Sequence, residues 1–254
     1  MERYRLINMT SSAKKRADKF ANFVGKNVIS FENPRVVSPP GVIRGHNRRN
    51  IIVATPTRSG THILIDLILN SFPDYCNIPL YVSLDKIIKR DRFQPGLLDT
   101  LRPDSGYVVK THFPIGVAPT VEERARVARL ASDAVVVTVR RKDADIIRSL
   151  SRFNAKGVET KGVEERFAAN IAAFWEFWED RATIGLDFDD LFTAEAYADA
   201  LDRLADLTGT QRPKQIRPPL HPSDIWRIYF NKLATRILGC RAPRIDTTIY
   251  TLKN

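Results

Sequence analysis

The sequence predicts an α/β protein: a single domain with a central parallel sheet flanked by helices. Short, wholly apolar runs rich in Val and Ile predict buried strands. Each run ends in a polar turn, and a segment with apolar residues at helical spacing follows several of these turns. Buried strands that alternate with helices are typical of a parallel sheet covered on both faces. At 254 residues, with 43% hydrophobic and 27% charged residues, the chain is long enough to form such a domain.

The first strand is expected over 51–55, where the β-branched run Ile-Ile-Val-Ala-Thr stands. The polar turn 56–62 follows it. A helix is expected over 63–72, because its apolar residues recur at helical spacing. These residues are Ile63, Leu64, Leu67 and Ile68.

The same pattern recurs along the chain. Further strands are expected over 107–110, 134–139 and 184–188. Further helices are expected over 121–132, 143–153, 163–182 and 194–207, the last closed by Gly209. The segments 73–106 and 154–165 read as loop-rich, and the proline-rich 210–254 reads as a wrapping segment or lid.

Positive charge is concentrated in residues 1–50, which hold eleven Lys and Arg against three acidic residues, in a chain of net charge +11. We expect a basic N-terminal arm or leader, with a helix over 12–24, ahead of a domain over 51–254. The arm could contact an anionic ligand, a membrane surface or nucleic acid, and a solvated leader is the alternative. The rest of the chain is nearly balanced in charge, so no dedicated nucleic-acid partner is expected.

Several classes of protein are disfavoured. No uncharged apolar run approaches the roughly 18 residues of a membrane helix, and residues 1–50 lack the apolar block of a secretory signal. Cys76 and Cys240 lie too far apart for a zinc motif or a disulfide framework. We therefore expect a cytoplasmic protein that works without a metal.

Three polar segments follow predicted strands, at 56–62, 110–114 and 140–142. Right-handed crossovers place the carboxyl ends of parallel strands along one edge of the sheet. The three segments are therefore expected to meet in one crevice.

The first segment has the composition of an anion site. Backbone N–H groups at a helix start have no acceptor within the helix, and Gly60 lets an anion approach them. Ser59 and Thr61 add hydroxyls, and Arg58 adds a permanent charge. An ordinary helix cap is the alternative. The first glycine and the lysine of G-x-x-x-x-G-K-[ST] are missing, which disfavours ATP or GTP.

The other two segments add a base and a second cation. His112 stands at a strand end two residues after Lys110, so strand alternation aims both at the crevice. Arg141 and Ser149 are spaced so that they could hold one phosphate between them. The alternatives are a structural histidine and an ordinary charged helix start with Asp143 at its cap.

Together the segments resemble the cytosolic-type and bacterial sulfotransferases, which use 3′-phosphoadenosine 5′-phosphosulfate (PAPS). Residues 56–62 are similar to the family's Tyr-Pro-Lys-Ser-Gly-Thr-Thr-Trp, with one residue inserted and Arg58 in the Lys position. Residues 110–114 resemble Lys-Thr-His-Leu-Pro, with Phe113 replacing Leu. The spacing Arg-x-x-x-Asp-x-x-x-Ser matches Arg141, Asp145 and Ser149, and 188–191 resemble Tyr-Glu-Asp-Leu more weakly.

The resemblance implies a P-loop-like sulfotransferase fold and sulfuryl transfer from PAPS to an acceptor hydroxyl, with adenosine 3′,5′-bisphosphate (PAP) as product and no metal. It implies that Arg58 binds the 5′-phosphate and the bridging oxygen, while His112 is the general base and Lys110 stabilises the transferring group. The 5′-phosphate would rest on Ser59, Gly60, Thr61 and His62. Arg141 and Ser149 would hold the 3′-phosphate.

The sequence also departs from the family. Ile63 stands where a Trp stacks on adenine, and the C-terminal Arg-Lys-Gly motif is absent. Trp226, in an Asp-Ile-Trp-Arg run, is expected to supply part of this binding, with packing in the core as the alternative. Three basic residues are further candidates for the 3′-phosphate: Arg212, Lys214 and Arg217.

The acceptor is expected to be a carbohydrate or another small molecule, and the oligomeric state is left open. Two other classes of function compete with sulfuryl transfer. One is a small-molecule kinase on a related fold, which the missing lysine disfavours. The other is a non-catalytic protein whose basic arm binds nucleic acid or anionic lipid.

Overall fold

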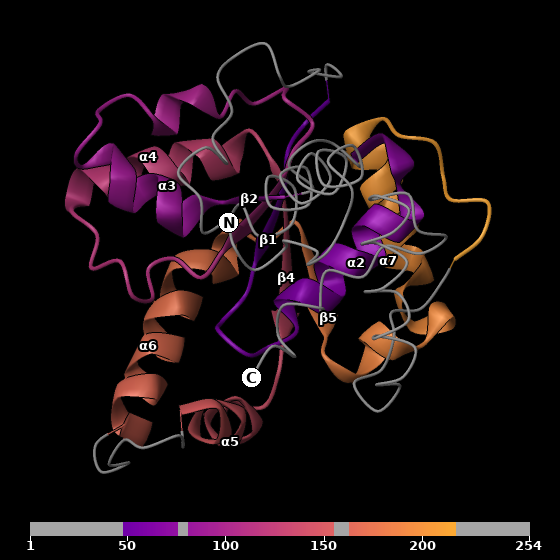
Figure 1. The fold of residues 1–254 in the computed structure, drawn as a ribbon. Coiled ribbons are helices and arrows are strands. Elements are labelled where there is room, and N and C mark those ends of the chain that lie inside the picture. The colour runs from indigo at the N-terminus through magenta and orange to yellow at the C-terminus, as the bar shows by residue number, and fades with distance from the viewer. Residues whose placement is uncertain (1–47, 76–80, 155–162, 217–254) are drawn as a thin grey trace, which may run out of the picture.

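A single sheet of five parallel strands forms the centre of the molecule in the computed structural model, which describes residues 48–75, 81–154 and 163–216 (Figure 1). The strand order is β2-β3-β1-β4-β5, and every neighbouring pair is parallel. The strands are β1 (Ile51–Ala54), β2 (Val82–Ser83), β3 (Val108–Thr111), β4 (Val135–Arg140) and β5 (Ile184–Asp187). The strands that precede the three polar segments are thus the adjacent trio β3, β1 and β4.

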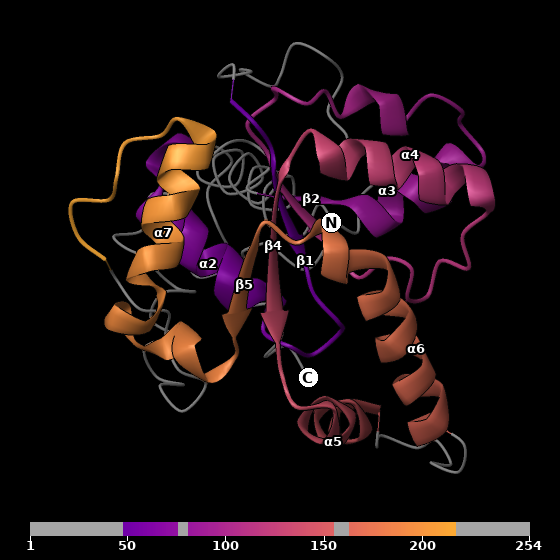
Figure 2. The ribbon, with the colours of Figure 1, turned by 180° about the vertical axis from the view of Figure 1, so that it is seen from behind.

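Helices cover both faces of this sheet. On one face lie α2 (Thr61–Ser71) and α7 (Ala194–Thr208). On the other lie α3 (Leu84–Asp91), α4 (Val121–Ser132) and α6 (Val163–Trp178). Helix α5 (Asp143–Asn154) packs on α6 beyond the carboxyl edge, and Figure 2 shows β4 pointing toward it.

Alternation along each strand divides the core in two. Ile51 and Val53 of β1 pack in the cluster with α2 and α7, whereas Ile52 and Ala54 pack in the cluster with α3, α4 and α6. All four are fully buried. A strand buried on both faces reads as a continuous apolar run, and this is why the run over 51–55 predicted a central strand.

The structure confirms the predicted fold class, and the predicted bounds of β1, β3, β4, β5, α2, α4, α5 and α7 agree to within two residues. The long helix expected over 163–182 ends earlier, at Trp178, and a 3₁₀ turn over Glu179–Arg181 continues it.

The expectation that 73–106 is loop-rich was wrong over 82–91, where β2 and α3 form. Strand β2 has only two residues, too few for any alternation to show. Helix α3 has eight residues, of which Leu84, Ile87 and Ile88 are buried apolar ones, so less than three turns of pattern are available.

Other expectations lie outside the described residues. These are the helix over 12–24, nearly all of the basic arm, and the C-terminal segment from 217 onward. Residues 48–50 are described and pack against the domain: Arg48 pairs with Asp74 at 3.0 Å, and the Asn50 side chain bonds the Arg102 carbonyl at 2.7 Å. Within the described ranges, no helix has the length and hydropathy of a membrane span.

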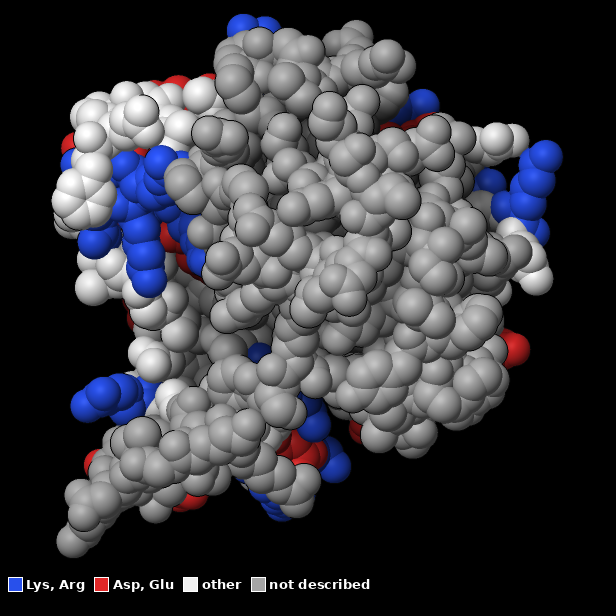
Figure 3. All heavy atoms as spheres, viewed as in Figure 1, with Lys and Arg blue, Asp and Glu red and all other residues white. Residues whose placement is uncertain are grey.

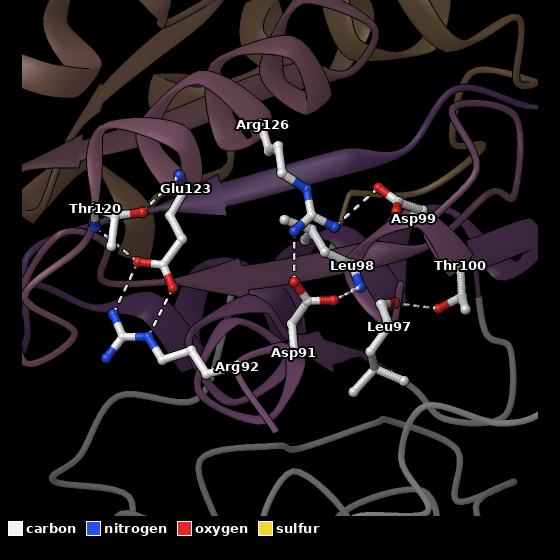
Figure 4. Close-up of polar contacts among 9 residues, drawn as sticks. All are labelled: Asp91, Arg92, Leu97, Leu98, Asp99, Thr100, Thr120, Glu123 and Arg126. Atoms are coloured by element: carbon white, nitrogen blue, oxygen red, sulfur yellow. Dashed lines mark hydrogen bonds and ion pairs between the residues drawn. The ribbon is translucent and has the colours of Figure 1, made fainter. Parts of the chain in front are cut away.

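A buried carboxylate joins α3, α4 and the loop between them (Figure 4). Asp91 accepts the Leu98 N–H at 2.9 Å and pairs with Arg126 of α4 at 2.5 Å. Burial raises the pKa of Asp91, but the hydrogen bonds from Leu98 and Arg126 outweigh it and hold that pKa below its ordinary value. Arg126 also reaches Asp99, whose side chain is 72% exposed.

We expect Asp91→Asn to lower the free energy of unfolding by about 1–3 kcal/mol, because it removes a charged partner from the half-buried Arg126. The matched change Asp99→Asn, at an exposed site, should cost less than about 0.5 kcal/mol. Urea unfolding measures both. The carboxylate of Asp91 has a lowered pKa in the folded state, so its contribution is complete above the unfolded-state pKa. It is lost as the pH falls through the folded-state pKa. Equal costs for Asp91→Asn and Asp99→Asn would show that the buried pair of Asp91 and Arg126 is no more stabilising than the exposed one.

Candidate functional site

The three polar segments meet at the carboxyl edge of β3, β1 and β4. Arg141, after β4, donates from Nη1 to the Arg58 carbonyl at 2.7 Å. Arg58, after β1, donates from Nε to Ser149 Oγ of α5 at 3.2 Å. His112, after β3, bonds from Nδ1 to the Thr55 carbonyl at 2.8 Å. The structure therefore brings Arg58, His112, Arg141 and Ser149 together, as the strand ends predicted.

The turn between β1 and α2 is built around two left-handed residues. Arg58 has φ 70° and Gly60 has φ 97°. A left-handed conformation is uncommon for arginine, and such conformations persist where the surrounding structure holds them, often at binding sites. The ring of Phe188 stands against Gly60, so close that a Cβ there would lie 2.9 Å from Phe188 Cδ2. Glycine is required here both for its conformation and for the space.

The hydroxyls of this turn are engaged within it. Ser59 Oγ donates to the Pro56 carbonyl at 2.6 Å, and Thr61 Oγ1 bonds Thr55 Oγ1 at 2.6 Å. Both residues are buried. We had expected these hydroxyls to bind a phosphate directly. These hydrogen bonds stabilise the turn, and the backbone N–H groups in the first turn of α2 are further candidates to bind an anion.

The guanidinium groups of Arg58 and Arg141 lie close enough for their charges to interact. Burial lowers the pKa of Arg58, and the charge of Arg141 lowers it further. Burial also lowers the pKa of Arg141, while Asp145 and Asp189 oppose that effect. Both groups remain charged at neutral pH. Two neighbouring cations in a partly buried place favour an anion that contacts both.

His112 is held in one tautomer. A carbonyl oxygen only accepts hydrogen bonds, so Nδ1 carries the proton toward Thr55 and Nε2 keeps its lone pair. Asp85 of α3 anchors the backbone here: its carboxylate accepts the His112 N–H at 3.0 Å and the Thr111 hydroxyl at 2.7 Å. The imidazole is thus oriented from two sides.

Burial lowers the pKa of His112 to about 4, and the nearby charge of Lys110 lowers it too, while Asp85 and the Thr55 carbonyl oppose the shift. Burial also lowers the pKa of Lys110, against the effect of Asp85. The imidazole is therefore neutral at physiological pH and able to accept a proton.

His62, in the first turn of α2, is a second half-buried imidazole. Burial lowers its pKa well below the ordinary value, and the charges of Lys110, His112 and Arg58 add to that shift. Its Nε2 lies 3.5 Å from the hydroxyl of Tyr81. The sequence did not point to Asp85, because it belongs to the region that was expected to be loop-rich.

A cavity of about 620 Å³ opens beside Arg141, at the ends of β4 and β5. Its lining mixes cations, carboxylates and two aromatic rings: Arg140, Arg141, Lys142, Asp143, Asp145, Trp175, Asp187, Phe188, Asp189 and Asp190. Among the described residues, no group of three or more His, Cys, Asp or Glu side chains is placed to hold a metal ion.

The C-terminal candidates are only partly described. Trp226 and Arg217 lie outside the described residues. Arg212 pairs with Asp206 at the end of α7, near Gly209, whose carbonyl accepts from Arg48 just before β1. This is the amino edge of the sheet, opposite the crevice, so the expectation that Arg212 binds the 3′-phosphate was wrong. The helix α7 runs back along the sheet and carries Arg212 away from the site.

No protein-family model matches the chain, and no curated protein matches it. Among solved structures, shikimate kinase from Bacteroides thetaiotaomicron aligns with TM-score 0.41 and 14% identity over 63% of this chain and 98% of its own. Retinol dehydratase in a complex with retinol and PAP aligns with TM-score 0.38 and 16% identity, over 84% and 77%. A sulfotransferase from Alicyclobacillus acidocaldarius aligns with TM-score 0.38 and 14% identity, over 77% and 97%. TM-scores below 0.5 decide neither family nor activity.

We expect Gly60→Ala to lower the free energy of unfolding by about 2–4 kcal/mol, because alanine adds left-handed strain and a clash with Phe188. Gly209→Ala is the matched control: Gly209 also has a positive φ, but nothing lies within 4 Å of its Cβ position. That change should cost only about 1 kcal/mol. Denaturant unfolding measures both, and equal costs would show that Phe188 does not confine the turn.

Proposed function

We propose that this protein transfers a sulfuryl group from PAPS to an acceptor hydroxyl. The observation that supports it best is the contact of Arg141 and Ser149 with Arg58, beside a neutral His112. A nucleotide with anionic groups at its 3′ and 5′ positions fits two neighbouring cations from separate strand ends. A base at the third strand end suits a hydroxyl acceptor.

The donor's 5′-phosphate would rest on the first turn of α2, over Gly60, Thr61 and His62, with Arg58 beside it. The 3′-phosphate would take the Arg141 guanidinium and the Ser149 hydroxyl. In the structure both groups form a hydrogen bond with Arg58. Arg141 would then exchange a neutral carbonyl acceptor for a charged phosphate oxygen, which binds more strongly, and the Ser149 hydroxyl could donate to the phosphate while it accepts from Arg58.

Sulfuryl transfer is an in-line displacement: a bond forms from the acceptor oxygen to sulfur as the bond from sulfur to the bridging oxygen breaks. Negative charge grows on the bridging oxygen of the departing PAP. Arg58 would neutralise that charge, and Lys110 would stabilise the transferring group.

His112 would take the acceptor's proton on Nε2, since its Nδ1 is committed to Thr55. A pKa of about 4 makes a weak base. The donor, however, brings negative charge next to Lys110 and His112. That charge raises the pKa of the imidazole toward neutrality, so the base would become competent only when the donor is bound.

The acceptor would approach from the side of α3, next to β3. Figure 3 shows Lys and Arg side chains gathered on the side of the molecule where Figure 1 has α3 and α4. Lys86 and Lys89 of α3 are exposed there. A hydroxyl on a carbohydrate or another polar small molecule suits such a surface.

A test of the donor is the binding of PAP against that of ATP with Mg²⁺, measured by calorimetry. We expect PAP to bind and ATP with Mg²⁺ to bind at least tenfold more weakly, because the lysine of the nucleoside-triphosphate loop is missing. Arg141→Ala should weaken PAP binding roughly 10- to 100-fold, the loss of a charged hydrogen bond. Arg140→Ala is the matched control, because Arg140 is engaged with Trp175 and Glu179. Stronger binding of ATP with Mg²⁺ would favour a kinase instead.

His112→Asn should leave PAP binding within about threefold of the original protein and reduce transfer by roughly 10²-fold or more. Transfer is followed as PAP release with 2-naphthol or 4-nitrophenyl glucoside as acceptor. In the original protein, the acid limb of the pH profile of kcat/KM should lie below pH 6.5, since the pKa of His112 is lowered in the free site. Lys110→Ala should move that limb to higher pH. Undiminished transfer by His112→Asn would rule out the base.

A further inference from the structure

The backbone of Phe188 is hydrogen-bonded to the last residue of β4, directly before Arg141. Phe188 directly follows β5, and its backbone N–H donates to the Arg140 carbonyl at 2.9 Å. The last register pair of the sheet, Arg140 with Asp187, lies just before both residues. The parallel pairing therefore sets Phe188 beside Arg141, at the edge of the site.

One aromatic ring contacts both halves of the proposed anion site. The guanidinium carbon of Arg141 lies 4.1 Å from the centroid of the Phe188 ring, within the range of a cation–π contact. The same guanidinium donates to the Arg58 carbonyl. The Cδ2 edge of the ring fills the space over Gly60.

Two carboxylates compete with the Phe188 ring for contact with the Arg141 guanidinium. Asp145 and Asp189 both act electrostatically on Arg141, and both line the cavity next to it. Without the ring, the Arg141 guanidinium would turn toward these carboxylates, because charged hydrogen bonds to them are favourable. The Phe188 ring gives the guanidinium a surface to rest on that faces the Arg58 turn.

We propose that Phe188 is a positioning residue that holds Arg141 against the Arg58 turn and thereby makes the site selective for nucleotides that carry a 3′-phosphate. The selectivity rests on the proposed function, because it assumes that Arg141 binds that phosphate. The positioning of Arg141 by the ring does not depend on any ligand. The two parts are therefore tested separately.

The ligand test compares PAP with adenosine 5′-phosphate, which differs only by the missing 3′-phosphate. Phe188→Leu should weaken PAP binding about tenfold, as measured by calorimetry, and leave the binding of adenosine 5′-phosphate within about twofold. Phe188→Tyr keeps the aromatic face and should restore PAP binding to within about threefold of the original protein. A Phe188 that only maintained the fold would weaken both nucleotides equally, and this result would overturn the selectivity.

Phe192→Leu is the matched control. Phe192 is the last residue of the 3₁₀ turn Asp189–Phe192, which directly follows Phe188, and it packs edge-on against Phe188 with ring centroids 5.6 Å apart. It should leave the ratio of the two affinities unchanged. If Phe192→Leu changed that ratio as much as Phe188→Leu, the effect would belong to the packing of the turn and not to the contact with Arg141.

A thermal-unfolding cycle tests the positioning without a ligand. We compare Phe188→Leu, Arg141→Ala and the double variant. If the ring and the guanidinium interact, the Tm shift of the double variant should fall short of the sum of the two single shifts. Additive shifts would overturn the positioning. If the original protein binds neither nucleotide, the proposed donor is wrong, and this cycle alone decides whether Phe188 positions Arg141.

Discussion

The hydrogen bond from the Arg141 guanidinium to the Arg58 carbonyl joins two segments that are 83 residues apart in the chain. It is possible only because β1 and β4 are parallel neighbours whose carboxyl ends lie side by side. Ser149 adds a third segment, α5, to this contact, because its hydroxyl accepts a hydrogen bond from Arg58 Nε. The site is therefore a product of strand order: a sheet with β1 and β4 separated would contain the same residues and no site.

This contact brings the positive charges of Arg58 and Arg141 close together, and their repulsion is unfavourable. Arg58 and Arg141 are both partly removed from water, and burial lowers the pKa of each. Asp145 and Asp189 offset part of the repulsion, and the Phe188 face stabilises the Arg141 cation without neutralising it. A bound dianion would relieve the remaining repulsion. The repulsion between the two cations therefore favours the binding of an anion.

Contacts from several elements determine the tautomer, the orientation and the pKa of His112. The Thr55 carbonyl selects the tautomer, Asp85 holds the backbone, and burial together with the charge of Lys110 lowers the pKa of the imidazole. Thr55 directly follows β1, Lys110 belongs to β3, and Asp85 lies in the first turn of α3. Three elements therefore set the state of one side chain, and two of them also carry groups of the proposed donor site.

The strands β1, β3 and β4 and their order of polar turns were determined by the sequence alone, because continuous apolar runs and helical spacing are local patterns. Arg58, His112, Arg141 and Ser149 could be named for the same reason. The two-residue strand β2, the short helix α3 and the partners Asp85 and Phe188 were decided only by the tertiary structure. Their positions depend on pairing with β3 and β4, and pairing between distant segments leaves no periodic mark in the chain. The inward turn of the Ser59 and Thr61 hydroxyls was likewise decided by the close packing of the turn.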